Sequence, residues 1–131
     1  MAYEINNYSL KITLVAGADL STHQYKFVEI GTGGVVTLCN GATDRPIGVL
    51  QNAPLQGEEA EIVVAGGTKI VASAALTVGT LIGTNNAGKA DAKVPGTDTT
   101  EYVVGTVILA VGADNEIATA VVNCAAPSRA A

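Results

Sequence analysis

The first candidate for acid–base chemistry in this 131-residue chain is its histidine. His23 is the only histidine, and a Ser/His/Asp arrangement would need it as the general base. Its neighbours Ser21-Thr22 and Gln24-Tyr25 are typical of a turn that leads into a strand, and no recognisable set of catalytic partners accompanies it. We therefore predict no catalytic residue, no cofactor and no enzymatic activity.

The densest acidic cluster consists of Glu58, Glu59 and Glu61, and it has two interpretations. The carboxylates could hold a divalent cation or work as an acid–base pair, or they could lie in a solvated turn. Hard cations require several oxygen ligands in a loop of defined spacing, which this cluster lacks, so we favour the turn and predict no metal site. The run Gly31-Thr32-Gly33-Gly34 is also interpreted as turn glycines, because a phosphate loop requires a helix behind it and residues 35–38 are strand-like.

The two cysteines, Cys39 and Cys124, have no CxxC spacing and no histidine nearby. We interpret them as small buried apolar side chains in a reducing compartment, with a Cys39–Cys124 disulfide as the alternative. The N-terminus lacks a basic region followed by an apolar core, so we predict no signal peptide.

Charge and hydropathy argue against two classes of partner. The net charge is −5 and the seven basic residues are scattered, whereas a phosphate-binding face requires clustered lysine and arginine. The longest apolar run, residues 103–113, is too short to span a bilayer as a helix. We therefore expect neither a direct nucleic-acid partner nor a membrane partner.

Composition favours a β-structure. Val, Ile and Thr together make up 39 of the 131 residues, and these types are enriched in strands. The 15 glycines are spread along the chain and disfavour long helices. The length fits one domain with its own core. We predict an all-β protein, a small β-barrel or β-sandwich of short antiparallel strands with at most one or two short helical turns.

Short apolar runs bounded by glycine, proline or asparagine predict the individual strands. The expected strands cover residues 10–15, 25–30, 35–39, 45–50, 61–67, 69–72, 80–83, 89–94, 101–111 and 116–124. Asn40-Gly41 predicts a type I′ turn after the third of these strands. Residues 73–78 predict either one helical turn or an irregular link, and residues 95–100 predict an exposed, mobile loop.

One hairpin-like unit is predicted to occur twice. The strand–connection–strand pattern around Gly48 returns around Gly105, and Glu61-Ile62 matches Glu116-Ile117. The second strand of the first unit is expected to end at the pair Gly66-Gly67. No residue in either copy is typical of a catalytic site.

The last two predicted strands are apolar on both faces. Val103, Val107 and Leu109 are expected on one face, and the residues that alternate with them are mostly apolar as well. A sheet with one wet face shows apolar-in, polar-out alternation, so the second face must be covered by another sheet, by barrel closure or by another subunit. We infer a closed or sandwiched β-domain that also forms a homo-oligomer, with Val103, Val107 and Leu109 as the expected interface.

The chain is divided into an N-terminal arm with the first strand over 1–18, a single β-rich core domain over 19–126, and a C-terminal tail over 127–131. The tail contains little that predicts a strand or a helix.

The N-terminal arm has spaced apolar side chains in a polar segment. An unpaired extended segment can add a strand to the sheet edge of another protein, with its side chains filling pockets there. Tyr3, Ile5, Tyr8 and Leu10 are the residues expected to make that contact. The alternative is a disordered terminus.

A set of motifs in a fixed order extends over residues 20–122. They are Gln24-Tyr25-Lys26-Phe27-Val28, Pro46-Ile47-Gly48-Val49-Leu50, Gly57-Glu58, Gly66-Gly67-Thr68-Lys69-Ile70-Val71-Ala72, Gly79-Thr80-Leu81-Ile82, Ala87-Gly88-Lys89-Ala90 and Val104-Gly105-Thr106. This pattern of glycines, prolines and apolar positions resembles the decoration, or cement, proteins of tailed-phage capsids.

The resemblance implies a small structural protein that binds the outside of an assembled, expanded phage head and reinforces the shell. Its implied partner is the major capsid protein, and its implied place is the outer capsid surface of the virion, after synthesis in the host cytoplasm. Such proteins are commonly trimers, although other members attach as monomers or dimers. The N-terminal arm often grips the capsid in related proteins, but residues 1–15 lie outside the matching motifs.

A carrier domain is the alternative, similar in outline to a lipoyl- or biotinyl-type domain. That function requires an exposed lysine in a hairpin, and Lys89, next to Gly88, is the only candidate. It lacks the flanking methionine of a biotinyl site, whereas a lipoyl site stays open.

Overall fold

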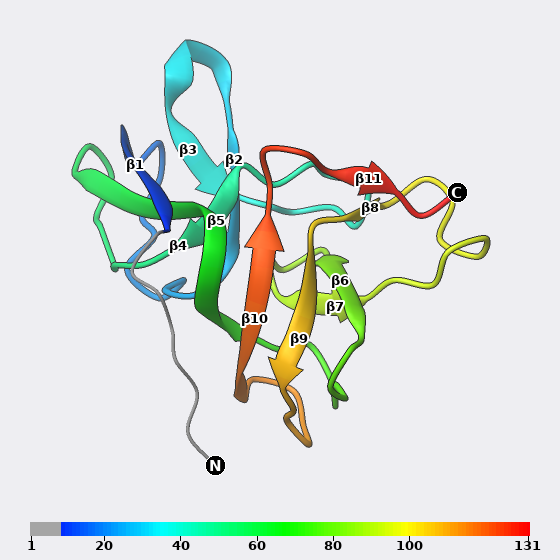
Figure 1. Cartoon of the computed structure of the whole chain (residues 1–131). Coiled ribbons are helices and arrows are strands. Elements are labelled where there is room, and N and C mark those ends of the chain that lie inside the picture. The colour runs from blue at the N-terminus through cyan, green and yellow to red at the C-terminus, as the bar shows by residue number, and fades with distance from the viewer. Residues whose placement is uncertain (1–8) are drawn as a thin grey trace.

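The fold is a curled antiparallel sheet with little other regular structure (Figure 1). The computed structural model describes residues 9–131. Its strands are β1 (Leu10–Val15), β2 (Phe27–Ile30), β3 (Val36–Leu38), β4 (Gly48–Leu50), β5 (Glu59–Val71), β6 (Leu81–Thr84), β7 (Ala90–Ala92), β8 (Tyr102–Val103), β9 (Gly105–Leu109), β10 (Ile117–Asn123) and β11 (Ser128–Arg129). One 3-10 turn, η1 (Thr32–Gly34), is the only helical element in this part of the chain. The predicted all-β class is confirmed, and the sheet curls into a half-barrel.

Nine strands form the main sheet, in the order β3-β2-β4-β5-β10-β9-β6-β7, with β1 paired to β5 outside this path. Strands β8 and β11 form a separate two-stranded sheet. Between residues 9 and 131, no helix has the length and apolar character needed to cross a bilayer.

Strand β5 connects the two parts of the sheet. Its first half pairs with β1 and β4, and its second half pairs with β10. Gly66 lies at the change of partner with φ of 126°, which favours glycine, and a Cβ added there would lie 2.6 Å from Oγ of Ser9. The predicted strand end at Gly66-Gly67 is therefore wrong: these glycines lie within one long strand that includes both 61–67 and 69–71.

The predicted repeat of one hairpin is present as β4–β5 and β9–β10. Gly48 and Gly105 have the same role in it, because each lies against the backbone of the partner strand. A Cβ at Gly48 would collide with Ile62 and Val63, and a Cβ at Gly105 would lie 2.7 Å from the carbonyl oxygen of Val121. Close approach of two backbones explains the glycine at both positions.

The register of the two hairpins contradicts the second part of the predicted repeat, in which Glu61-Ile62 corresponds to Glu116-Ile117. Leu50, two residues after Gly48, pairs with Ile62. Val107, two residues after Gly105, pairs with Ala120. The counterpart of Ile62 is therefore Ala120, and the proposed equivalence of Glu61-Ile62 with Glu116-Ile117 is wrong by three residues.

The segment after β3 is not the predicted type I′ hairpin turn. That turn requires a positive φ at both central residues, and neither Asn40 nor Gly41 has one. The amides of Asn40 and Gly41 instead both donate to Oδ2 of Asp44 at 2.9 Å. The connection is a side-chain-capped loop, and β2 lies between β3 and β4 in the sheet. Residues 73–78 form an irregular link without a helical turn.

The C-terminal residues do not form the predicted tail. Ser128 and Arg129 pair with Val103 and Tyr102, and Ala130 is 1% exposed. The Arg129 guanidinium lies 5.0 Å from the centre of the Tyr102 ring, within the range of a cation–π contact. This pairing divides the predicted strand 101–111 into β8 and β9.

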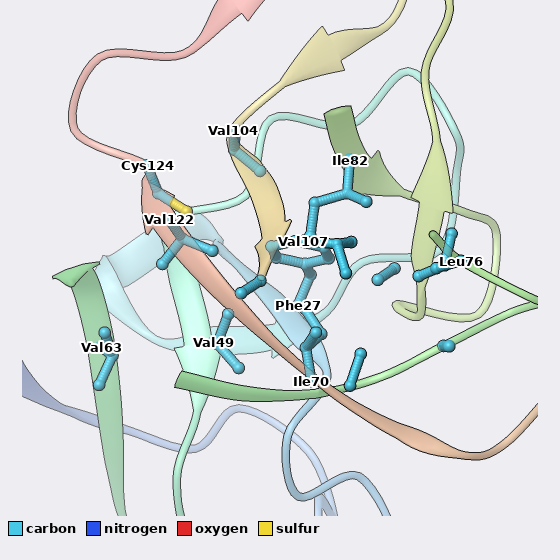
Figure 2. Close-up of a cluster of buried hydrophobic side chains, with 14 of the residues drawn as sticks. Phe27, Val49, Val63, Ile70, Leu76, Ile82, Val104, Val107, Val122 and Cys124 are labelled. Atoms are coloured by element: carbon cyan, nitrogen blue, oxygen red, sulfur yellow. The ribbon is translucent and has the colours of Figure 1, made fainter. Parts of the chain in front are cut away.

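The core has two clusters of buried side chains. The larger cluster fills the curl of β2, β5, β6, β9 and β10, and Figure 2 shows Phe27, Ile82, Val107 and Val122 in it. The smaller cluster lies around Leu20, beside β1, β2 and the first half of β5. Because aromatic residues are scarce, aliphatic side chains fill the core on both sides of the bent strand β5.

Candidate functional site

The imidazole of His23 lies beside the cationic side chain of Lys26. Its Nδ1 lies 3.1 Å from Nζ of Lys26. Burial of the ring, and then the charge of Lys26, lower the pKa of His23 below its usual value. Within residues 9–131, no serine, threonine or cysteine side chain forms a hydrogen bond with this imidazole. The geometry therefore places no nucleophile where His23 would activate it.

The predicted acidic turn is solvated. Glu58, Glu59 and Glu61 are all exposed, and Oε1 of Glu58 accepts a hydrogen bond from the amide of Leu55 at 2.6 Å. That bond closes the loop between β4 and β5. Within residues 9–131, these three carboxylates do not come together as a set of possible metal ligands.

A different group of metal-type donors was missed by sequence reasoning. Glu29, Cys39 and Asp44 place one donor atom each within 4.8 Å of one another, because β2 pairs with β3 and the loop after β3 folds back. Burial, and then Asp44, raise the pKa of Glu29, and burial is also the main cause of the raised pKa of the Cys39 thiol. Asp44 already accepts the two amide hydrogen bonds of its loop. Asp44 is therefore engaged by its own loop, and the raised pKa of Cys39 favours the protonated thiol, which is a poor metal ligand.

Cys39 and Cys124 are both buried free thiols. The structure thus follows the first interpretation of the pair, as small buried apolar side chains, and not the disulfide alternative. Burial raises the pKa of Cys124 to about 12, which keeps its thiol protonated.

Lys89 is in the turn between β6 and β7, as a carrier hairpin would require, but it is engaged there. Its ammonium forms an ion pair of 3.0 Å with Oδ1 of Asp114, and its side chain is only 17% exposed. A lysine that carries a swinging cofactor must project freely into solvent. The contacts of Lys89 give no support to the carrier alternative.

The most deeply buried charge among the described residues is a structural one. The side chain of Lys93 has no exposed surface, and its ammonium lies 2.7 Å from Glu101 and 3.3 Å from Asp91. Asp91 also accepts a hydrogen bond from Ser73 at 3.2 Å. This network fastens the segment before β8 to β7, and its residues line neither the groove beside Arg45 nor the hollow beside Pro54.

The three residues of the expected interface do not share one face. Val107 is 1% exposed and lies in the core (Figure 2), whereas Leu109 is 59% exposed. The cause is a bulge: Leu109 pairs with Thr119 and Val107 pairs with the next residue of β10, so β9 has one extra residue between them. Val103 belongs to β8. The prediction of a common face is wrong, and association of the chain through this region stays a prediction.

Apolar side chains do gather on the outer face of β9 and β10. Leu109, Ile117 and Val121 are 59%, 50% and 48% exposed. Leu109 lies opposite Thr119, which is between Ile117 and Val121 on β10, so the three form one patch. We call these three residues the outer patch. The opposite face of β10 is buried in the core, so this strand is apolar on both faces, as predicted.

Three of the four arm residues expected to contact a partner, Tyr3, Ile5 and Tyr8, lie outside the described residues. The fourth, Leu10, is the first residue of β1, pairs with Ala65 and is 54% exposed. Its side chain is available at the surface.

A groove of about 330 Å³ lies where the end of β2, the segment before β4 and the link from β10 to β11 meet. Most of its lining residues are apolar, Ile30, Pro46, Ile47 and Pro127 among them, while polar atoms form about half of its surface. Arg45 is its only charged residue.

Comparison with known proteins finds a likeness in structure but none in sequence. The sequence matches no protein-family model and no curated protein. Its structure is similar to that of the N base of head fiber gp8.5 in bacteriophage phi29, with a TM-score of 0.61 and 18% sequence identity. The match covers 88% of this chain and 94% of the other. At this identity the likeness shows a shared fold.

Proposed function

We propose that this chain is a non-enzymatic structural protein of a bacteriophage head, which binds the outer surface of the assembled capsid as a decoration, or cement, protein. The observation that carries the proposal is the shared fold with a phage head fiber base over nearly the full length of both chains. The motifs that resemble cement proteins support the same role independently. The partner is the major capsid protein, and the chain joins the virion after synthesis in the host cytoplasm.

Binding that is selective for the expanded shell would stabilise it without any chemistry. A protein that binds only one state of the lattice lowers the free energy of that state by RT ln(1 + [L]/Kd), about 4 kcal/mol per site at a concentration 1,000 times Kd. Repeated over many lattice sites, this linkage opposes the internal pressure of packaged DNA. A sheet with a well-packed core suits the task, because it transmits load without rearranging.

The test uses heads of the phage whose genome encodes the chain. Purified protein is mixed with expanded heads and, separately, with unexpanded heads, and binding is measured by co-sedimentation. We expect saturable binding to expanded heads and at least tenfold weaker binding to unexpanded heads, a difference of about 1.4 kcal/mol or more per site. Equal binding to both forms would remove the stabilising mechanism, and binding to neither would remove the decoration role.

We further propose that the chain forms a homotrimer and that the outer patch lies between its copies. An exposed, contiguous patch of aliphatic side chains is typical of an interaction site. Light scattering should give three times the 13.1 kDa chain mass for the natural protein.

The variant Leu109→Glu should reduce the mass to that of one chain, because an unpaired carboxylate is costly to bury. Leu55→Glu is the matched control, since Leu55 is 53% exposed on the loop between β4 and β5. A trimer that survives Leu109→Glu would exclude the outer patch as its interface.

A further inference from the structure

The groove beside Arg45 has the properties of a site for an extended peptide. Its volume of about 330 Å³ is within the lower range of pockets that bind small ligands. Ile30, which is 53% exposed, lines it together with Pro46, Ile47 and Pro127. An occupant would need apolar side chains to cover these surfaces.

Arg45 adds a charge requirement. Its side chain is exposed, and it forms no ion pair with any residue between 9 and 131. The preceding residue, Asp44, forms no ion pair with it, and that carboxylate instead accepts the amides of Asn40 and Gly41. An occupant with a carboxylate would gain a charge-assisted hydrogen bond at a guanidinium that is otherwise unpaired.

The chain enters the described structure close to this groove. Ser9 lies against Gly66, and Gly66 pairs with Val122. Two residues later, the amide of Cys124 donates to the carbonyl of Val64, and Cys124 lines the groove. Eight extended residues span at most about 26–29 Å, which is ample for residues 1–8 to reach the groove from Ser9.

The sequence of residues 1–8 has the required chemistry. Tyr3 and Ile5 are apolar, and Glu4 between them is the only charged side chain of the segment. In an extended segment, successive side chains point to opposite sides. Tyr3 and Ile5 can then face the apolar lining while Glu4 turns toward the rim.

We propose that residues 1–8 dock in the groove of their own chain, with Tyr3 and Ile5 on its apolar lining and the carboxylate of Glu4 on the guanidinium of Arg45. Connection through Ser9 makes the docking intramolecular, so a weak contact suffices to fill the groove. The proposal concerns the free protein and does not depend on a role in a phage head. If the arm also contacts a capsid, it must first leave the groove.

Paramagnetic NMR on the full-length protein tests the proposal. The variant Ala2→Cys carries a nitroxide label, and the buried thiols of Cys39 and Cys124 stay unlabelled under native conditions. We expect loss of the amide signals of Ile30 and Ile47, which line the groove. Signals of residues 112–115, which lie at the end of β10 opposite to Cys124 and the groove, should remain.

Charge variants then identify the contact. Arg45→Glu should restore the groove signals, and the double variant Glu4→Lys/Arg45→Glu should lose them again. Lys69→Glu is the control, because it makes the same change in net charge at an exposed residue outside the groove.

Three results would overturn the proposal. The first is retention of the groove signals in the labelled natural background. The second is their continued loss in Arg45→Glu. The third is their loss in a mixture of spin-labelled protein with unlabelled, isotope-enriched protein, which would assign the groove to the arm of another copy.

Discussion

Replacement of Glu101 by glutamine should destabilise the protein strongly, although the two side chains have nearly the same size. Lys93 has no exposed side-chain surface, and Glu101 is its nearer partner at 2.7 Å with 17% of its own side chain exposed. Glutamine keeps the shape and removes the charge. The buried ammonium then depends on Asp91, which is 3.3 Å away and 41% exposed.

The magnitude follows from the burial of the two partners. Breaking a buried ion pair by removing one partner costs about 3–5 kcal/mol, whereas an exposed pair contributes about 0–1 kcal/mol. Asp91 remains to compensate Lys93 in part, so we expect Glu101→Gln to lower the free energy of unfolding by about 2–3 kcal/mol. Lys93→Met should cost less, about 1–2 kcal/mol, because it removes the buried charge itself and leaves carboxylates that reach water.

Urea unfolding of the four proteins of a double-mutant cycle measures these terms. In the background of Lys93→Met, the change Glu101→Gln should cost almost nothing, which gives a coupling energy of about 2–3 kcal/mol between the two residues. Lys89→Met is the control, because its ion pair with the 56% exposed Asp114 should contribute less than about 1 kcal/mol. A Glu101→Gln cost below about 0.5 kcal/mol, or additive effects in the cycle, would refute the reasoning.

Three further predictions follow from the described residues. Gly66→Ala should lower the free energy of unfolding in urea by about 1–3 kcal/mol, because a φ of 126° is strained for alanine. Gly67→Ala has open space around its Cβ position and should change the free energy of unfolding by less than about 0.5 kcal/mol. Equal costs for the two variants would contradict the special backbone conformation at Gly66. Burial, and then a nearby lysine, lower the folded-state pKa of His23 below 6.5, so its contribution to stability is present above pH 6.5 and is lost as the pH falls through the folded pKa. The variant His23→Gln should flatten this part of the curve of unfolding free energy against pH, and an unchanged slope would count against the shift. Cys39 and Cys124 should react with a thiol reagent slowly in the native state and completely after unfolding without reductant, and a count of zero thiols would reveal a disulfide.

Much of the fold could be predicted from local sequence patterns. Alternating or continuous apolar runs identify β1, β6 and β10, and composition alone excludes long helices. The match between Gly48 and Gly105 identifies a repeated hairpin, because both positions require close backbone approach. These features depend on a few neighbouring residues or on chemistry that only glycine provides.

The errors concern features that depend on residues far apart in the chain. Gly66-Gly67 predicts a strand end from local propensity, but pairing with β10 continues the strand to Val71. Residues 128–129 have no strand pattern of their own, and they are ordered by pairing with β8. Local reasoning misses such tertiary pairings.

The expected common face of Val107 and Leu109 is wrong for a related reason. Strict alternation predicts Val107 and Leu109 on one face, but a bulge in β9 turns one inward and the other outward. A bulge changes the face of every later residue, and its location is decided by the partner strand. The outer patch therefore retains Leu109 and takes its other members from β10. Similarly, Glu29 and Asp44 come together only through the loop that folds back after β3.

The central claim is that the chain decorates the outside of an expanded phage head, and imaging of such heads tests it most directly. Electron cryo-microscopy would compare expanded heads incubated with the protein and expanded heads without it. The account predicts additional density on the outer surface at three-fold positions of the lattice, each fitted by three copies of this curled β-sheet. Expanded heads whose outer surface stays bare at saturating protein, or density confined to the inner surface, would contradict it.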